Sequence, residues 1–163
     1  MTIGDLASLI IALATTGSLL YISRQVNVAR RQTKGQFLLA LDEQFERVRD
    51  IAMYIVNDPS FEPQGQQWTE VWRLMSVFER MNIMMEDKIL DIDVIDRLWG
   101  FILTTLIAND ALFKRLEASG TEWKDFIDLC YAIADHRTRR DKTEFDENFI
   151  RRVHKLNKQT HRL

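Results

Sequence analysis

Three kinds of side chain in this sequence could do chemistry: a carboxylate on an apolar helix face, one thiol, and three histidines near the C-terminus. Glu79 lies beside the apolar positions of a predicted helix, next to Arg80 and one turn before Asn82. A half-buried glutamate can act as a general acid, or it can form a structural ion pair with Arg97 or Arg115 from another helix. Burial raises the pKa of such a carboxyl and a cationic partner lowers it. We expect Glu79 and Asn82 to be buried polar groups with a structural role.

The thiol and the imidazoles do not match a catalytic or metal-binding pattern. Cys130 lies in DFIDLCYAIAD among apolar residues at helical spacing, with no histidine close in sequence, which predicts a buried and inert thiol. His154 and His161 would lie on one side of a helix two turns apart, too far to share one ion without further ligands. The third histidine is His136, and the sequence contains no phosphate-binding glycine loop, GxSxG or CxxC motif. We therefore predict no catalytic residue, no cofactor and no metal site.

Basic residues are concentrated at the end of the chain, in HRTRRDK and IRRVHKLNKQTHRL. Such clusters are typical of nucleic-acid binding. However, the acidic segment TEFDENF separates them, and the formal net charge of the chain is -2. We therefore favour a solvated or membrane-facing tail over a nucleic-acid partner.

The stretch Leu6–Ile22, LASLIIALATTGSLLYI, contains no charged residue, and the nearest charges are Asp5 before it and Arg24 after it. A signal peptide would have a basic start and a small-residue cleavage site, and neither is present. At about 1.5 Å per residue the run extends about 25 Å, and the flanking residues bring it to the thickness of a bilayer core. The run predicts a single transmembrane helix over residues 1–23. The alternatives are a buried core helix or an amphipathic surface helix.

The flanking charges predict the orientation of this helix. Arg24, Arg30, Arg31 and Lys34 follow the run, and only Asp5 precedes it. The positive-inside rule places the N-terminus outside and the rest of the chain in the cytoplasm. The four cations would contact anionic lipid headgroups at about 1 kcal/mol each.

Small residues on the run suggest a contact face. Ala7, Ile11, Ala14 and Ser18 follow a spacing of 3.5 residues, and small side chains let transmembrane helices approach closely. With one such helix per chain, the contact would join two copies, which predicts a homo-oligomer. The alternatives are hydroxyl groups that bond only to their own helix, and a pore lined by hydroxyl side chains.

The rest of the chain predicts an all-α fold. Six glycines and two prolines leave few turn signals, and apolar residues recur at helical spacing. We expect the N-terminal helix to continue into a cytoplasmic bundle of about four to five helices. A bend is expected at Gly35, a loop at 58–67, and a break near Asn109. The predicted parts are a transmembrane anchor (1–23), a basic juxtamembrane helix (24–36), a helical domain (37–136) and a basic C-terminal tail (137–163).

The stretch VFERMNIMMEDKILDIDVIDRLWG resembles an uncharacterised family of small bacterial single-pass membrane proteins. Phe78-Glu79, Glu86-Asp87, Ile89-Leu90-Asp91 and Trp99-Gly100 occupy the positions of the family pattern. The resemblance covers about two fifths of the chain and the anchor. It implies a transmembrane helix in a bacterial inner membrane followed by a cytoplasmic helical domain, and it implies no activity.

A weaker resemblance is to membrane accessory proteins of phage-defence systems, including one associated with RNA-targeting CRISPR effectors. It implies oligomerisation through the N-terminal helix. The Arg-x4-6-His motif of helical RNases is absent: Arg151 and Arg152 are too close to His154 and too far from His161.

These observations predict a membrane-anchored helical interaction protein whose partners are the bilayer, a second copy and an unidentified protein. One alternative is a pore-forming or membrane-disrupting accessory effector of antiviral defence. A further alternative is a membrane-tethered RNA-processing enzyme that uses the arginines and histidine near the C-terminus.

Overall fold

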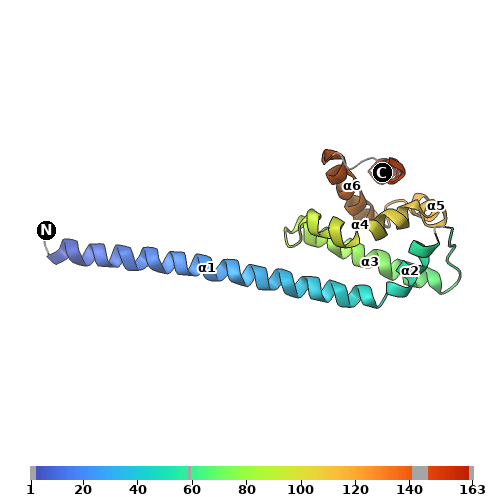
Figure 1. The fold of residues 1–163 in the computed structure, drawn as a ribbon. Coiled ribbons are helices and arrows are strands. Elements are labelled where there is room, and N and C mark those ends of the chain that lie inside the picture. The colour runs from blue at the N-terminus through green and yellow to red at the C-terminus, as the bar shows by residue number, and fades with distance from the viewer. Residues whose placement is uncertain (1–2, 59, 141–146, 162–163) are drawn as a thin grey trace. The chain divides into compact units, whose positions relative to one another are not determined.

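A computed structural model describes residues 3–58, 60–140 and 147–161, and all regular secondary structure in these ranges is helical (Figure 1). The predicted all-α fold class is therefore confirmed. The chain divides into two units, residues 1–40 and residues 41–163. Within the first helix, the side chains of residues 3–17, 19, 20, 27, 30 and 31 lie outside the described part.

The first unit is formed by helix α1 (Ile3–Glu46), whose last residues belong to the second unit. Helix α1 continues without interruption through Gly35, where we predicted a bend. A glycine inside a helix costs only about 1 kcal/mol relative to alanine, so it permits a bend without imposing one.

Helix α1 breaks after Glu46, and α2 (Arg49–Asn57) follows as a separate helix. Val48 leaves the helical conformation with φ -118° and ψ 10°, and its amide donates to the carbonyl of Phe45 at 3.0 Å. The break turns the chain so that Leu41, Val48 and Ile51 are all buried.

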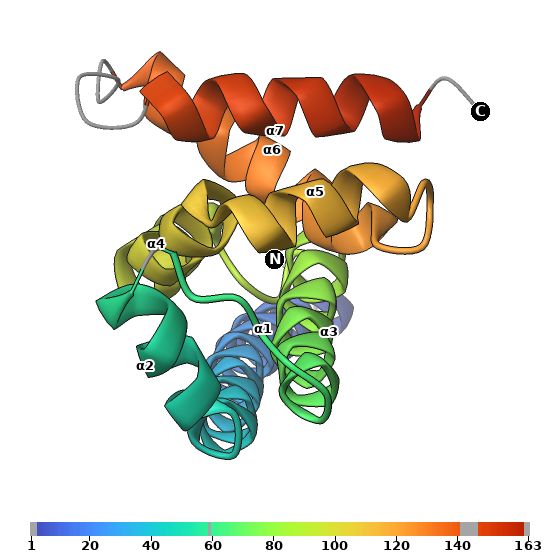
Figure 2. The same ribbon diagram turned by 90° about the vertical axis from the view of Figure 1, so that its right-hand side faces the viewer.

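The second unit contains α3 (Gln67–Glu86), α4 (Ile92–Ala108), α5 (Asp110–Ala118), α6 (Lys124–Arg139) and α7 (Glu147–Thr160). Helix α3 packs on α6, and α4 packs on α2, α5, α6 and α7. The aromatic core joins α3 to α6, where the ring centroids of Phe78 and Phe126 are 6.1 Å apart. Figure 2 shows α7 on one side of α6 and of the α4–α5 pair, with α2 and α3 on the other side.

The break predicted near Asn109 is confirmed, since α4 ends there and α5 begins at the next residue. The Asn109 backbone is extended, with ψ 122°, and its side-chain oxygen accepts from the Leu112 amide at 3.0 Å. Its amide nitrogen donates to the carbonyl of Phe61 at 2.8 Å. One asparagine therefore caps α5 and also holds the loop before α3.

Residues 147–160 belong to the helical unit and do not form the separate solvated tail that we predicted. Phe149, Val153 and Leu156 are buried, and α7 packs against α4, α5 and α6. Helix α6 also extends past the predicted domain end to Arg139. The predicted boundary at 136/137 therefore falls inside a helix.

A buried ion pair joins α4 to α6. Arg137 Nη2 lies 2.6 Å from Asp96 Oδ1, and the side chains are 10% and 15% exposed. Arg137 Nη1 donates to the hydroxyl of Thr104 at 2.8 Å, and the guanidinium carbon lies 5.4 Å from the ring centroid of Phe149 on α7. Gly100 faces this pair: a Cβ added there would lie 2.3 Å from Asp96 Oδ1 and 2.5 Å from Arg137 Nη2.

Gly100→Ala is expected to lower the free energy of unfolding by about 1–3 kcal/mol, because the added methyl group forces the ion pair apart. Chemical denaturation of the full chain measures this change. Gly35→Ala is the matched control, since a Cβ there meets nothing within 4 Å. The assigned role of Gly100 would be contradicted if Gly100→Ala were as stable as the unmodified chain. It would also be contradicted if Gly35→Ala lost as much stability as Gly100→Ala.

Candidate functional site

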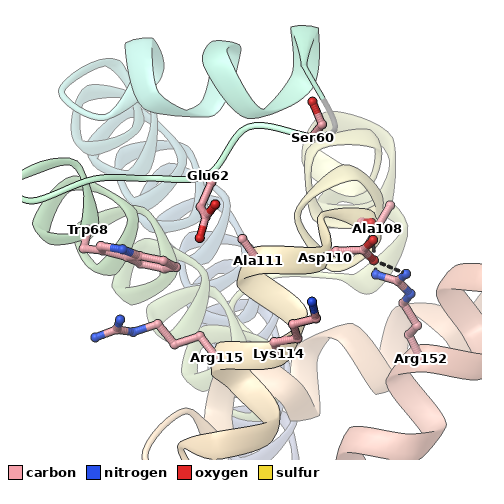
Figure 3. A pocket seen from close by; sticks show the side chains of 9 residues that line it. All are labelled: Ser60, Glu62, Trp68, Ala108, Asp110, Ala111, Lys114, Arg115 and Arg152. Carbon is pink, nitrogen blue, oxygen red and sulfur yellow. Dashed lines mark hydrogen bonds and ion pairs between the residues drawn. The ribbon is translucent and has the colours of Figure 1, made fainter.

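The candidate site is a pocket of about 760 Å³ in the second unit, between the loop after α2 and the start of α5 (Figure 3). The loop is held by Phe61, whose carbonyl accepts from Asn109 and whose ring stacks on Tyr54 with centroids 5.9 Å apart. The loop, the start of α3, the α4–α5 junction and α7 all contribute side chains. The lining residues are Ser60, Glu62, Trp68, Ala108, Asp110, Ala111, Lys114, Arg115 and Arg152.

Arg152 closes one side of this pocket. It donates to the carbonyls of Ile107 and Ala108 at 3.1 and 3.0 Å, and it pairs with Asp110 at 2.5 Å. These carbonyls end α4 and have no partner further along that helix, so a guanidinium satisfies them well. The hydrogen bond from Arg152, and then its charge, lower the pKa of Asp110 below its ordinary value. Arg152 therefore fixes α7 to the α4–α5 junction.

Arg115 lies against two tryptophans of α3. Its guanidinium carbon is 4.4 Å from the ring centroid of Trp68 and 5.4 Å from that of Trp72, which are cation–π distances. Figure 3 shows Arg115 and Lys114 leaving α5 in different directions, with Arg115 on the side of Trp68. Among the residues that the structure describes, neither Arg115 nor Arg97 forms the ion pair with Glu79 that we considered, and Arg115 instead lies against these rings.

The pocket therefore presents charges of both signs beside one aromatic wall. Glu62 and Asp110 supply carboxylates, and Lys114, Arg115 and Arg152 supply cations. Such a lining can bind a polar ligand through ion pairs and hydrogen bonds. In the described residues no group of three or more His, Cys, Asp or Glu is placed to hold a metal ion.

A second charged cluster lies where α4 meets α6, and the sequence interpretation missed it. Asp93 Oδ1 is 3.1 Å from His136 Nε2 and 2.6 Å from Arg140 Nη1, close in sequence to the buried pair of Asp96 and Arg137. The acids are three residues apart on α4, and the bases lie at the end of α6, with His136 and Arg137 in its last turn and Arg140 at its C-cap. The signal was present in IDVIDRL and HRTRR, but choosing this pairing required knowing which helices are neighbours.

Glu79 is half-buried, as expected, but its surroundings are acidic. Burial, followed by the nearby carboxylates of Asp125 and Glu122, raises the pKa of Glu79 above its ordinary value of 4.5. Asn82 is buried, and its amide donates to Glu86 Oε1 at 3.2 Å. Its side-chain oxygen is buried without a hydrogen-bond partner in the described part of the chain.

Cys130 is fully buried, which confirms the prediction for this thiol. Burial raises the pKa of Cys130 far above that of a free thiol, so the reactive thiolate is suppressed.

The residues of the RNA-processing alternative make separate contacts. Arg151 donates to Asn148 at 3.0 Å, and Arg152 occupies the α4–α5 junction. The rings of His154 and Tyr131 meet edge to face at 5.2 Å, and His161 Nε2 lies 3.0 Å from Asp128 Oδ1. Each of these arginines and histidines therefore contacts a different partner, and none of these contacts joins an arginine to a histidine.

The predicted residues of α1 are described only in part. Ser18 and Arg24 are exposed and Lys34 is half-buried, whereas the side chains of Ala7, Ile11, Ala14, Arg30 and Arg31 lie outside the described residues. Over the residues that the structure describes, no helix has a stretch that is both long and apolar enough to cross a membrane. The membrane anchor therefore stays a prediction.

Comparison of the chain with protein-family models, with curated proteins and with solved structures gives no match. Both resemblances seen in the sequence stay predictions.

Glu122→Gln is expected to lower the pKa of Glu79, because it removes one of the negative charges that raise it. A carboxyl with a raised pKa in the folded state binds protons more tightly there, so it makes the fold less stable as the pH rises above 4.5. Glu79→Gln should therefore reduce this loss of stability. Carboxyl titration by NMR, together with denaturation at several pH values, measures both effects. A Glu79 pKa at or below 4.5 in the unmodified chain would contradict the prediction.

Proposed function

We propose that this protein is a membrane-anchored helical interaction protein that self-associates through its N-terminal helix. The observation that carries the proposal is the uncharged run Leu6–Ile22 with cations on its C-terminal side only. This pattern is typical of a single-pass anchor with the following domain in the cytoplasm.

The exposed side chains at the end of the run support this proposal. Tyr21 is 63% exposed and Ile22 is 53% exposed. Tyrosine is favoured where a transmembrane helix crosses the headgroup region, and Arg24 follows Tyr21 three residues later. A helix without tertiary packing gains little stability in water, so a bilayer or a second helix is the natural cover for these residues.

The helical domain also has an apolar surface that supports protein contact. Leu98 and Phe101 are 53% and 70% exposed and lie one turn apart on α4. Exposed apolar groups of this kind mark interaction sites when they cluster. We propose a second copy of the chain as the partner, because anchoring in one membrane raises the local concentration of copies.

Ile11→Lys is expected to abolish membrane attachment, because a lysine at the centre of a spanning helix costs about 2.5–3.5 kcal/mol. Flotation of the full chain with lipid vesicles measures the bound fraction. Ile11→Leu is the matched control and should float like the unmodified protein. An unmodified chain that stays with the unbound fraction would refute the anchor.

Ala14→Ile is expected to weaken self-association, because a larger side chain on the small-residue face keeps two helices apart. Native mass spectrometry of the full chain in detergent measures the oligomer. Ala12→Ile is the control, since Ala12 lies on another side of the same helix. A strictly monomeric unmodified chain would count against self-association, and so would equal effects of the two substitutions.

A pore-forming accessory effector of antiviral defence is the second candidate for the same helix. It is favoured by the adjacent hydroxyl residues Thr15, Thr16 and Ser18 in the apolar run. Release of dye from the vesicles used for flotation distinguishes the two candidates, because an anchor leaves the vesicles sealed.

A further inference from the structure

A second hollow of the helical unit, a groove of about 380 Å³, lies along the exposed face of α3. Thr69, Arg73, Ser76 and Arg80 recur on this face at a spacing of three to four residues. The turn between α1 and α2 supplies the opposite wall. The lining residues are Gln44, Arg47, Val48, Thr69, Trp72, Arg73, Ser76, Val77 and Arg80.

The groove lining contains three arginines and no acidic residue. Arg47 pairs outside the groove lining with Glu43 at 2.7 Å, and Arg80 donates to Gln44. No hydrogen bond or ion pair joins Arg73 to another residue in the described ranges. Its guanidinium is exposed, so its donors face the groove or solvent and are available to an anion.

An aromatic ring and an apolar floor complete the groove. Trp72 is 39% exposed, while Val48 and Val77 are buried. The Trp72 ring is also held by Arg115, whose guanidinium carbon lies 5.4 Å from its centroid. The groove therefore combines the available donors of Arg73 with an exposed tryptophan ring that Arg115 also contacts.

We propose that this groove binds a small phosphate ester that carries a planar ring, a ligand of the nucleotide class. Guanidinium groups match the geometry of phosphate oxygens, and the hydroxyls of Thr69 and Ser76 add hydrogen-bond donors. A planar base can stack on a tryptophan ring, and this stacking stabilises the complex whichever base is present. The volume fits a ligand of this size, at the lower end of small-molecule pockets. The proposal does not depend on the membrane anchor.

Calorimetric titration of the full chain in a neutral detergent tests the proposal with three probes: AMP, adenosine and inorganic phosphate. AMP is expected to bind more tightly than either of its parts. Arg73→Gln should weaken AMP binding about tenfold, the loss expected for one charge-assisted hydrogen bond. Arg97→Gln is the matched control, because Arg97 is exposed and lies on α4 outside the groove. Both substitutions remove one positive charge.

Trp72→Leu should weaken AMP binding while leaving phosphate binding unchanged, and Trp72→Phe should restore most of the AMP affinity. The thermal midpoint of each variant shows that the unit is folded. The proposal is overturned if AMP does not bind at millimolar concentration, or if Arg97→Gln weakens binding as much as Arg73→Gln. Equal binding of AMP and phosphate in the unmodified chain would overturn the role of Trp72.

Discussion

The second unit depends on the ion pair between Asp96 and Arg137. Two charges that are 15% and 10% exposed are expensive to remove from water, and their attraction offsets that cost only when the remaining donors are satisfied. The hydroxyl of Thr104 accepts a hydrogen bond from Arg137 Nη1, and the Phe149 ring lies against the guanidinium. The arrangement therefore fixes α4, α6 and α7 together. It also explains Gly100, since any side chain there would occupy the space of the carboxylate and the guanidinium.

Helix α7 is held at a second point by the same chemistry. Arg137 of α6 meets Phe149 near the start of α7, and Arg152 reaches from α7 to the last carbonyls of α4. In both cases a guanidinium also lies near a ring, because Arg152 is 4.8 Å from the centroid of Phe113. Arginine suits this role because its planar group can form hydrogen bonds at its edge while its face contacts an aromatic ring. The basic residues near the C-terminus thus stabilise the fold as well as contributing charge.

The sequence predicted those parts of the fold that depend on local patterns. Apolar spacing located α3, and the polar residue Asn109 between two apolar runs located the start of α5. The errors came from long-range contacts. Helix α7 has only Phe149, Val153 and Leu156 as regular apolar positions among many charges, so its burial follows from the surface that α4 and α6 offer. Arg115 was expected near a carboxylate, but it reaches two tryptophans of α3 because the fold brings them beside α5, and no spacing in the sequence encodes that proximity.

Arg115 also connects the pocket beside α5 with the groove along α3. Trp68 lines the pocket beside α5, Trp72 lines the groove along α3, and the guanidinium of Arg115 lies within cation–π distance of both rings. Each ring loses freedom through this contact, so both walls are partly preorganised before any ligand arrives. A ligand that stacks on Trp72 acts on a ring whose electrons already attract Arg115. The lining of the pocket and the lining of the groove therefore share a contact with one guanidinium.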